Sequence, residues 1–94
     1  MPEPQIERFE NVWDALEKNA FDAQRMRIKS DMMITIEKII RSRGLTQAEA
    51  AAQCGVTQPR ISDLFRGKIE KFSIDALLDM LTALRCTVTF AVKA

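Results

Sequence analysis

The side chains best suited to specific hydrogen bonding lie close together between positions 57 and 63. The amide of Gln58 can pair with adenine N6 and N7, and the hydroxyl of Ser62 can bond to several base edges. The carboxylate of Asp63 is unusual in such a set, because it can accept from cytosine N4 or repel phosphates and so sharpen the register. These residue types predict a surface that reads base edges. It is formed by Thr57, Gln58, Pro59, Ser62 and Asp63.

Cationic side chains surround these polar groups, although the whole chain has a net charge of only +1. Residues 38–71 contain seven bases and three acids, whereas residues 1–24 contain six acids and two bases. Such charge runs often mark solvated surface, but cations beside a base-reading surface can also neutralise phosphates. The first residue of a predicted helix is also well placed for a phosphate contact. The candidate phosphate contacts are Gln47, at such a helix start, and Arg60, Arg66, Lys68 and Lys71.

The composition argues against an enzyme and against a metal or an organic cofactor. The chain has no histidine, which is the commonest general base and metal ligand. Its two cysteines, Cys54 and Cys86, lie far apart and lack CxxC spacing. Neither a run of about 18 apolar residues nor a signal peptide is evident. The sequence therefore predicts one cytoplasmic domain that does not enter a membrane, binds no cofactor or metal, and is not an enzyme.

The polar positions fall on the second of two short predicted helices, in residues 47–66, which read QAEAAAQCGVTQPRISDLFR. Thr46 and Glu49 fit a capping box that starts the first helix, and Gly55 suits the turn because it can adopt positive φ. Thr57 can cap the second helix. This is a helix-turn-helix pattern, in which the outer, N-terminal side of the second helix enters the major groove. The expected core positions are Ala50, Ala51, Cys54, Val56, Ile61 and Leu64.

Helical periodicity extends to both sides of this pair of helices. Asn11 can cap a short amphipathic helix, and a second helical run begins near Phe21 and extends as far as Arg43. The pattern leaves open whether this run breaks around residues 29–31. Ser73 caps a last helix with apolar residues at 3–4 spacing. The sequence therefore predicts an all-α bundle of about five helices.

The periodicity changes at residues 87–92, where polar and apolar residues alternate and β-branched or aromatic types dominate. This pattern predicts one strand, formed by Thr87, Val88, Thr89, Phe90 and Val92. Because a lone strand edge recruits another strand, we expect antiparallel pairing with a second copy in a homodimer. Such a dimer presents two recognition helices about 34 Å apart, or a multiple of that distance. The alternatives are folding back, fraying, and pairing with a strand from a toxin.

The run GLTQAEAAAQCGVTQPRISDLFRGK resembles the lambda-repressor-like Xre helix-turn-helix family at nearly every structural position, and the similarity covers residues 32–85. The upstream NVWDAL and the downstream RISDLFRGKIEKFSIDALLDMLTALRCTVTF are similar to a smaller branch. That branch contains HigA-type antitoxins and antitoxin-like regulators. Arg85 departs from the pattern, because such sequences often have glycine there.

The resemblance implies a lambda-repressor-like bundle that binds double-stranded operator DNA as a homodimer. It further implies a sequence-specific transcriptional regulator that acts as antitoxin and autorepressor of a type II toxin–antitoxin pair, with a RelE-like toxin as partner. A free-standing repressor, or an interaction module that sequesters a partner without binding DNA, are the alternatives. We divide the chain into an N-terminal helical extension (1–30), a helix-turn-helix DNA-binding domain (31–85) and a C-terminal dimerisation strand (86–94).

Overall fold

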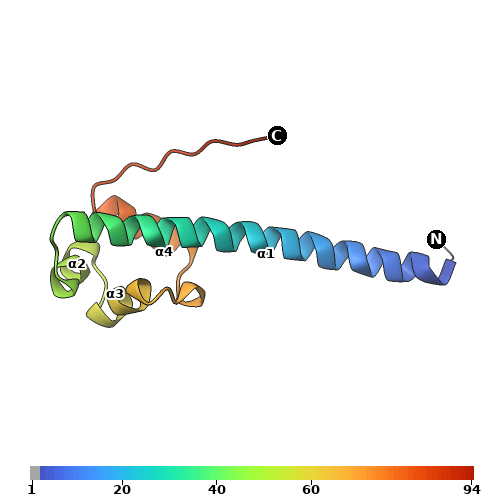
Figure 1. Cartoon of the computed structure of the whole chain (residues 1–94), viewed down its shortest axis with the longest axis horizontal. Coiled ribbons are helices and arrows are strands. Elements are labelled where there is room, and N and C mark those ends of the chain that lie inside the picture. The colour runs from blue at the N-terminus through green and yellow to red at the C-terminus, as the bar shows by residue number, and fades with distance from the viewer. Residues whose placement is uncertain (1–2) are drawn as a thin grey trace.

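The computed structural model describes the backbone of residues 3–94 and the side chains of residues 19–94. One long helix carries shorter helices packed near its C-terminal end (Figure 1). All regular structure in this part of the chain is helical, which confirms the predicted all-α class. The elements in chain order are α1 (Glu3–Ser42), α2 (Gln47–Cys54), α3 (Gln58–Phe65), the 3-10 turn η1 (Ile69–Lys71) and α4 (Ile74–Ala83).

α1 is a single continuous helix, so the prediction of separate helices before residue 44 is wrong. Residues 5–43 contain neither proline nor glycine, and a polar residue such as Asn19 does not by itself end a helix. The helix ends at Ser42, shortly before Gly44, which has φ +65°, and the Leu45 N–H donates to the Ile40 carbonyl at 3.1 Å. The described residues thus contain four α-helices and one 3-10 turn rather than about five helices.

Asn11 lies within α1, which begins at Glu3, so the prediction that Asn11 caps the start of a helix is wrong. The domain division after residue 30 falls within α1, which passes that position without a break, and the division stays a prediction. Within the described residues, neither α1 nor any other helix is long and apolar enough to cross a membrane.

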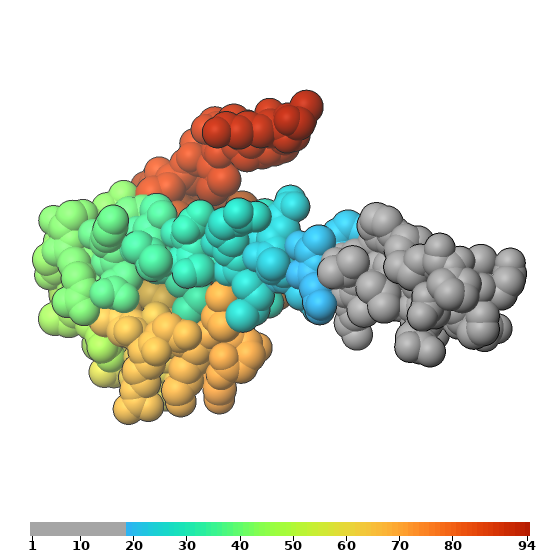
Figure 2. Space-filling view, turned by 45° about the vertical axis from the view of Figure 1, so that its right-hand side comes forward, coloured from blue at the N-terminus to red at the C-terminus, as the bar shows by residue number. Residues whose placement is uncertain are grey.

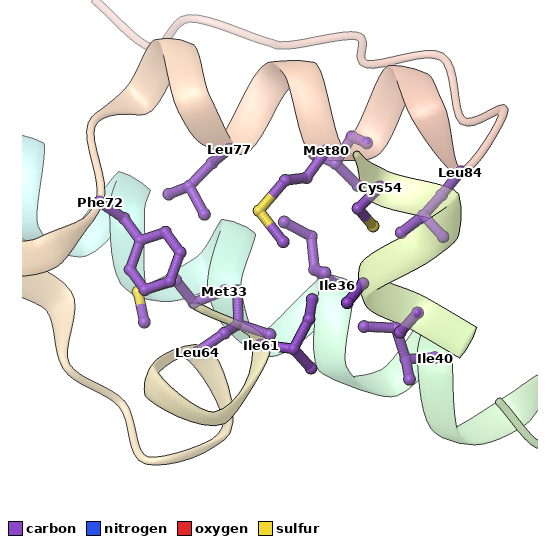
Figure 3. Packing of buried hydrophobic residues seen from close by; sticks show 13 residues of the cluster. Met33, Ile36, Ile40, Cys54, Ile61, Leu64, Phe72, Leu77, Met80 and Leu84 are labelled. Carbon is purple, nitrogen blue, oxygen red and sulfur yellow. The ribbon is translucent and has the colours of Figure 1, made fainter. Parts of the chain in front are cut away.

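The four helices share one apolar core (Figure 3). α1 packs against α3, α4 and η1, and α2 packs against α3 and α4. Each fully buried aliphatic side chain contributes about 1.5–3 kcal/mol, so this cluster fixes the positions of α2 and α3. The predicted core positions are confirmed, with Val56 partly buried. The buried residues are Met33, Ile36, Ile40, Ala50, Ala51, Cys54, Ile61, Leu64, Phe72, Leu77, Met80, Leu81 and Leu84.

The chain leaves α4 through a tight turn at Arg85, which has φ +63°. The Cys86 N–H donates to the Leu81 carbonyl at 2.9 Å, as in a helix that ends at a glycine. Arg43 Nη1 donates to the Leu84 carbonyl at 2.8 Å and holds this turn against α1. Arginine therefore adopts the left-handed conformation that glycine favours, at a cost of about 1 kcal/mol.

Residues 86–94 follow as an extended segment that runs back along the molecule (Figure 1). The predicted strand is wrong for the single chain. No strand occurs in the described part of the chain, and residues 87–94 make no backbone hydrogen bond there. The physical reason is that a strand needs a neighbouring strand to bond with, and this helical chain offers none. The structure contains a single chain, so it does not show the predicted pairing of two such segments in a homodimer.

Candidate nucleic-acid interface

α2 begins at the predicted capping box, which is confirmed. The Thr46 N–H donates to Glu49 Oε1 at 2.8 Å, and the Thr46 hydroxyl accepts from the Glu49 N–H at 3.1 Å. The bond from the Thr46 backbone, followed by that from its side chain, lowers the pKa of Glu49 because both favour the charged carboxylate. At the other end of α2, Gly55 has φ +69° and its N–H donates to the Ala51 carbonyl. Both ends of α2 are therefore fixed by local bonds.

α3 follows the turn and is held by its inner face. Ile61 and Leu64 are 0% and 1% exposed, and they anchor the helix in the core. On α2, Ala50 and Ala51 are buried, and such small side chains let two crossing helices approach closely. The predicted helix-turn-helix is confirmed, with α3 starting directly after Thr57. The inner residues thus leave the opposite side of α3 facing solvent.

That outer side carries the predicted base-reading residues. Thr57, Gln58 and Pro59 are exposed at the N-terminal end of α3, and Ser62 and Asp63 are half-buried one turn later. Thr57 occupies the N-cap position, but its hydroxyl makes no capping bond, so the predicted side-chain cap is wrong. Its hydroxyl is consequently not committed to the helix. Pro59 lies in the first turn, where a missing N–H costs nothing.

Asp63 and Lys68, predicted for different roles, form an ion pair. Lys68 Nζ lies 3.7 Å from Asp63 Oδ1, and the two side chains are 38% and 21% exposed. The Lys68 N–H also donates to the Asp63 carbonyl at 3.0 Å, and this bond keeps the two residues close together. A partly exposed pair of this kind contributes at most about 1 kcal/mol to stability. Its larger consequence is that a cation beside the reading surface already has a counter-ion.

Arg60, a predicted phosphate contact, is bonded within the protein. Its Nη1 donates to the Lys71 carbonyl at 2.6 Å, and its guanidinium lies 5.4 Å from the centre of the Phe72 ring. These contacts tie α3 to η1 and the following turn. Arg60 therefore positions neighbouring backbone while its side chain remains exposed.

The other predicted phosphate contacts lie around α2, α3 and η1. Gln47 is half-buried at the first residue of α2, Arg66 is exposed at the end of α3, and Lys71 is exposed at the end of η1. Figures 1 and 2 place these elements on one side of α1 and the C-terminal segment on the other. The candidate residues thus gather on one side of the molecule.

Two further cations were missed by sequence reasoning. The Arg41 guanidinium lies 4.8 Å from the centre of the Phe65 ring, and Arg41 Nε donates to Glu37 at 2.9 Å, so the end of α3 is held by α1. Lys29 lines the same hollow as Arg60 and Lys71. No local signal marks either residue, because each meets the site only after α1 packs against α3 and η1.

A helix fixed by its predecessor, with an exposed polar N-terminal end and cations around it, defines a helix-turn-helix DNA-binding protein. Comparison with protein families matches residues 17–93 to a family described as a helix-turn-helix domain. A solved structure assigned by its name to the XRE family of transcriptional regulators is similar to this chain, with 33% sequence identity and a TM-score of 0.72. The match covers 78% of this chain and 82% of that one.

The chain belongs to the XRE family of helix-turn-helix proteins. This confirms the family predicted from residues 32–85 and identifies a DNA-binding transcriptional regulator. The comparison with curated proteins found no match.

Proposed function

We propose that this chain is a sequence-specific repressor that binds its own operator in the cytoplasm as a homodimer. The observation that carries the proposal is the two-sided character of α3. Its inner face is closed by Ile61 and Leu64, whereas Thr57 and Gln58 are exposed at its N-terminal end. A helix held in this way enters the major groove as a rigid element, so that side chains at its leading end meet base edges.

In this proposal Thr57, Gln58, Pro59 and Ser62 face the bases. Gln58 carries most of the discrimination, because a bidentate amide distinguishes adenine from the other bases. Gln47, Arg66 and Lys71 contact phosphates at the rim, and such contacts set affinity and register without reading sequence. Asp63 and Lys68 act together at the edge of this surface, and Arg60 supports it through its bond to the Lys71 carbonyl.

The homodimer follows from the C-terminal segment, in which Thr87, Val88, Thr89, Phe90 and Val92 supply the dimerisation strand. Two copies related by a two-fold axis present two α3 helices to successive major grooves on one side of the duplex, about 34 Å apart or a multiple of that distance. The expected operator is therefore an inverted repeat.

The test compares the full-length chain with Gln58→Ala on its own promoter DNA and on scrambled DNA. If Gln58 makes a bidentate base contact, the substitution lowers discrimination between the two DNAs by about 1–3 kcal/mol. Gln53→Ala, at an exposed position on α2 outside the candidate set, is the matched control and leaves discrimination unchanged. Retention of full discrimination by Gln58→Ala shows that the reading surface is wrongly assigned.

A salt titration separates DNA binding from a pure protein-interaction module. Binding to the promoter should weaken steeply as salt rises, with a log–log slope of about −0.9 for each neutralised phosphate. Lys71→Ala should weaken binding to all sequences alike, whereas Lys93→Ala, on the C-terminal segment, should not. A chain that shows no specific binding at low salt acts only on protein, and the repressor proposal then fails.

An antitoxin role is the second candidate, and it rests on the similarity to HigA-type sequences. Two observations favour it. The helix α1 projects beyond the short helices (Figure 1), and its apolar side chains Phe21 and Met26 are 57% and 51% exposed. Such a surface can bind a RelE-like toxin while α3 remains available to DNA. The test is co-expression with the product of a small, basic reading frame next to this gene. Co-purification and rescue of growth support the role, and independent purification of the two proteins contradicts it.

A further inference from the structure

A groove of about 550 Å³ lies between α1, α4 and the C-terminal segment, on the side of the molecule away from α3. Its floor comes from α1 and α4, and one wall is the extended segment itself. We call it the α1–α4 groove. The floor residues used below are Ile28, Met32, Ile74 and Leu78, and the wall residues are Phe90 and Val92.

The wall residues line the groove without filling it. Phe90 and Val92 remain 87% and 81% exposed although they border an apolar floor. Within the described residues, the exposed large apolar side chains lie only on α1 and the C-terminal segment. These residues are Phe21, Met26, Ile28, Ile34, Val88, Phe90 and Val92. Of these, Ile28 on α1 and Val88, Phe90 and Val92 on the C-terminal segment border the same groove, and an exposed apolar patch of this kind marks a protein-binding site.

The wall is held in place at its origin. The Cys86 N–H is bonded to the Leu81 carbonyl, and Arg43 is bonded to the Leu84 carbonyl, so the segment leaves α4 in a fixed direction. Beyond this point residues 87–94 make no backbone hydrogen bond within the described part of the chain. An occupant of the groove therefore meets both an apolar floor and an extended segment whose backbone groups are available for hydrogen bonding.

These two features together define the occupant's chemistry. It must be extended, so that its backbone bonds to the exposed edge, and it must carry apolar side chains at alternate positions to cover the floor. Residues 88–92 of this chain meet both requirements, because Val88, Phe90 and Val92 alternate with Thr89 and Ala91.

We propose that the α1–α4 groove receives the C-terminal segment of a second copy, so that Phe90 of each chain packs on Ile74 and Leu78 of the other. The exchange is reciprocal, as an isologous two-fold interface requires, and the two segments run antiparallel. The inference deepens the proposed homodimer and rests on it, since it names the surface that the exchanged strand covers. It also places the interface opposite α3, which leaves both reading surfaces open.

The test uses sedimentation equilibrium of the full chain and of two variants, Phe90→Glu and Leu78→Lys. Each variant places a charge in the contact, and we expect each to weaken dimerisation about 100-fold. Phe90 is exposed in the single chain, so Phe90→Glu leaves the fold intact, and far-UV circular dichroism checks Leu78→Lys. Thr82→Lys, at an exposed position on α4 outside the groove, is the control and stays dimeric.

Mixing the two variants tests the exchange itself. In the mixed pair, one groove joins Lys at position 78 to Glu at position 90 of the other chain, and the second groove is wild type. The mixture should therefore regain dimerisation that neither variant shows alone. A mixture that stays monomeric shows that each segment packs on its own chain and overturns the exchange.

Two other results would overturn the proposal that the α1–α4 groove receives the C-terminal segment of a second copy. A monomeric wild-type chain, even one that takes up a strand from a toxin, shows that the groove does not serve a second copy. A dimer that survives both substitutions shows that the interface lies elsewhere. These outcomes are distinct from failure of the repressor proposal, in which the chain dimerises through the groove but binds no DNA specifically.

Discussion

The α2–α3 unit and the outer side of α1 with the C-terminal segment are built in opposite ways. In the first, both ends of α2 are capped, Ile61 and Leu64 anchor α3 in the core, and the polar Thr57 and Gln58 are exposed. In the second, Phe90 and Val92 are exposed, and residues 87–94 make no backbone hydrogen bond to any other described residue. The difference indicates two kinds of partner, because a polar surface surrounded by cations suits a polyanion, whereas an exposed apolar segment in extended conformation suits another protein.

The largest expected effect comes from removing an anchor of α3. Ile61 is fully buried, so Ile61→Ala should lower the free energy of unfolding by about 2–5 kcal/mol and abolish promoter binding. Ile34→Ala, at a position that is 50% exposed on α1, removes the same atoms and should cost far less. Urea unfolding of the two variants checks the contrast. Equal losses would mean that the two regions are packed alike.

The ion pair between Asp63 and Lys68 should change how strongly DNA affinity depends on salt concentration. Asp63→Asn releases Lys68, and the slope of log affinity against log salt should become steeper by about 0.9. Lys68→Ala should then cost more in the Asp63→Asn background than in the wild type, whereas Lys71→Ala should cost the same in both. Binding isotherms at several salt concentrations measure this coupling. Additive effects of the Asp63 and Lys68 substitutions would show that Asp63 does not restrain Lys68.

The turn before the C-terminal segment offers a stabilising change. Arg85 has φ +63°, so Arg85→Gly should raise the free energy of unfolding by about 1 kcal/mol. Arg85→Ala, which removes the same side chain but keeps a Cβ, is the control and should not stabilise the protein. Thermal unfolding measures both variants at one protein concentration. Equal stability of the two variants would contradict the left-handed turn.

The smallest expected effect is the pH dependence of the capping box. The pKa of Glu49 is lowered from its ordinary value of 4.5, so the folded state binds its proton less readily than the unfolded state. The stabilisation is therefore complete above about pH 4.5 and is lost as the pH falls through the lowered pKa. Wild type should lose stability faster than Glu49→Gln on acidification, with Glu70→Gln as the control. Parallel curves for wild type and Glu49→Gln would contradict the box.

The α2–α3 unit could be predicted because its signals are local. Thr46 and Glu49 lie three residues apart, Gly55 comes directly after the last residue of α2, and the spacing of Ile61 and Leu64 follows helical periodicity. Continuity of α1 was harder to predict, because Asn19 favours a helix end locally while the residues around it favour helix.

The remaining features depend on contacts between distant residues. The bond of Arg60 to the Lys71 carbonyl and the stacking of Arg41 on Phe65 form only once α3 packs against its neighbours. The state of residues 87–92 depends on a partner strand, which the sequence of one chain cannot supply. Gln58 was identified from its chemistry, and the fold places it at the exposed end of α3.

Methylation interference on DNA upstream of this gene tests most directly whether two copies of α3 enter major grooves. We expect interference at major-groove positions in two patches on one side of the duplex, with centres about 34 Å or a multiple of that apart. Gln58→Ala should remove the sensitivity to 7-deazaadenine at specific positions, whereas ethylation interference at the phosphates should persist. A single patch, interference confined to the minor groove, or an unchanged pattern with Gln58→Ala would contradict this expectation.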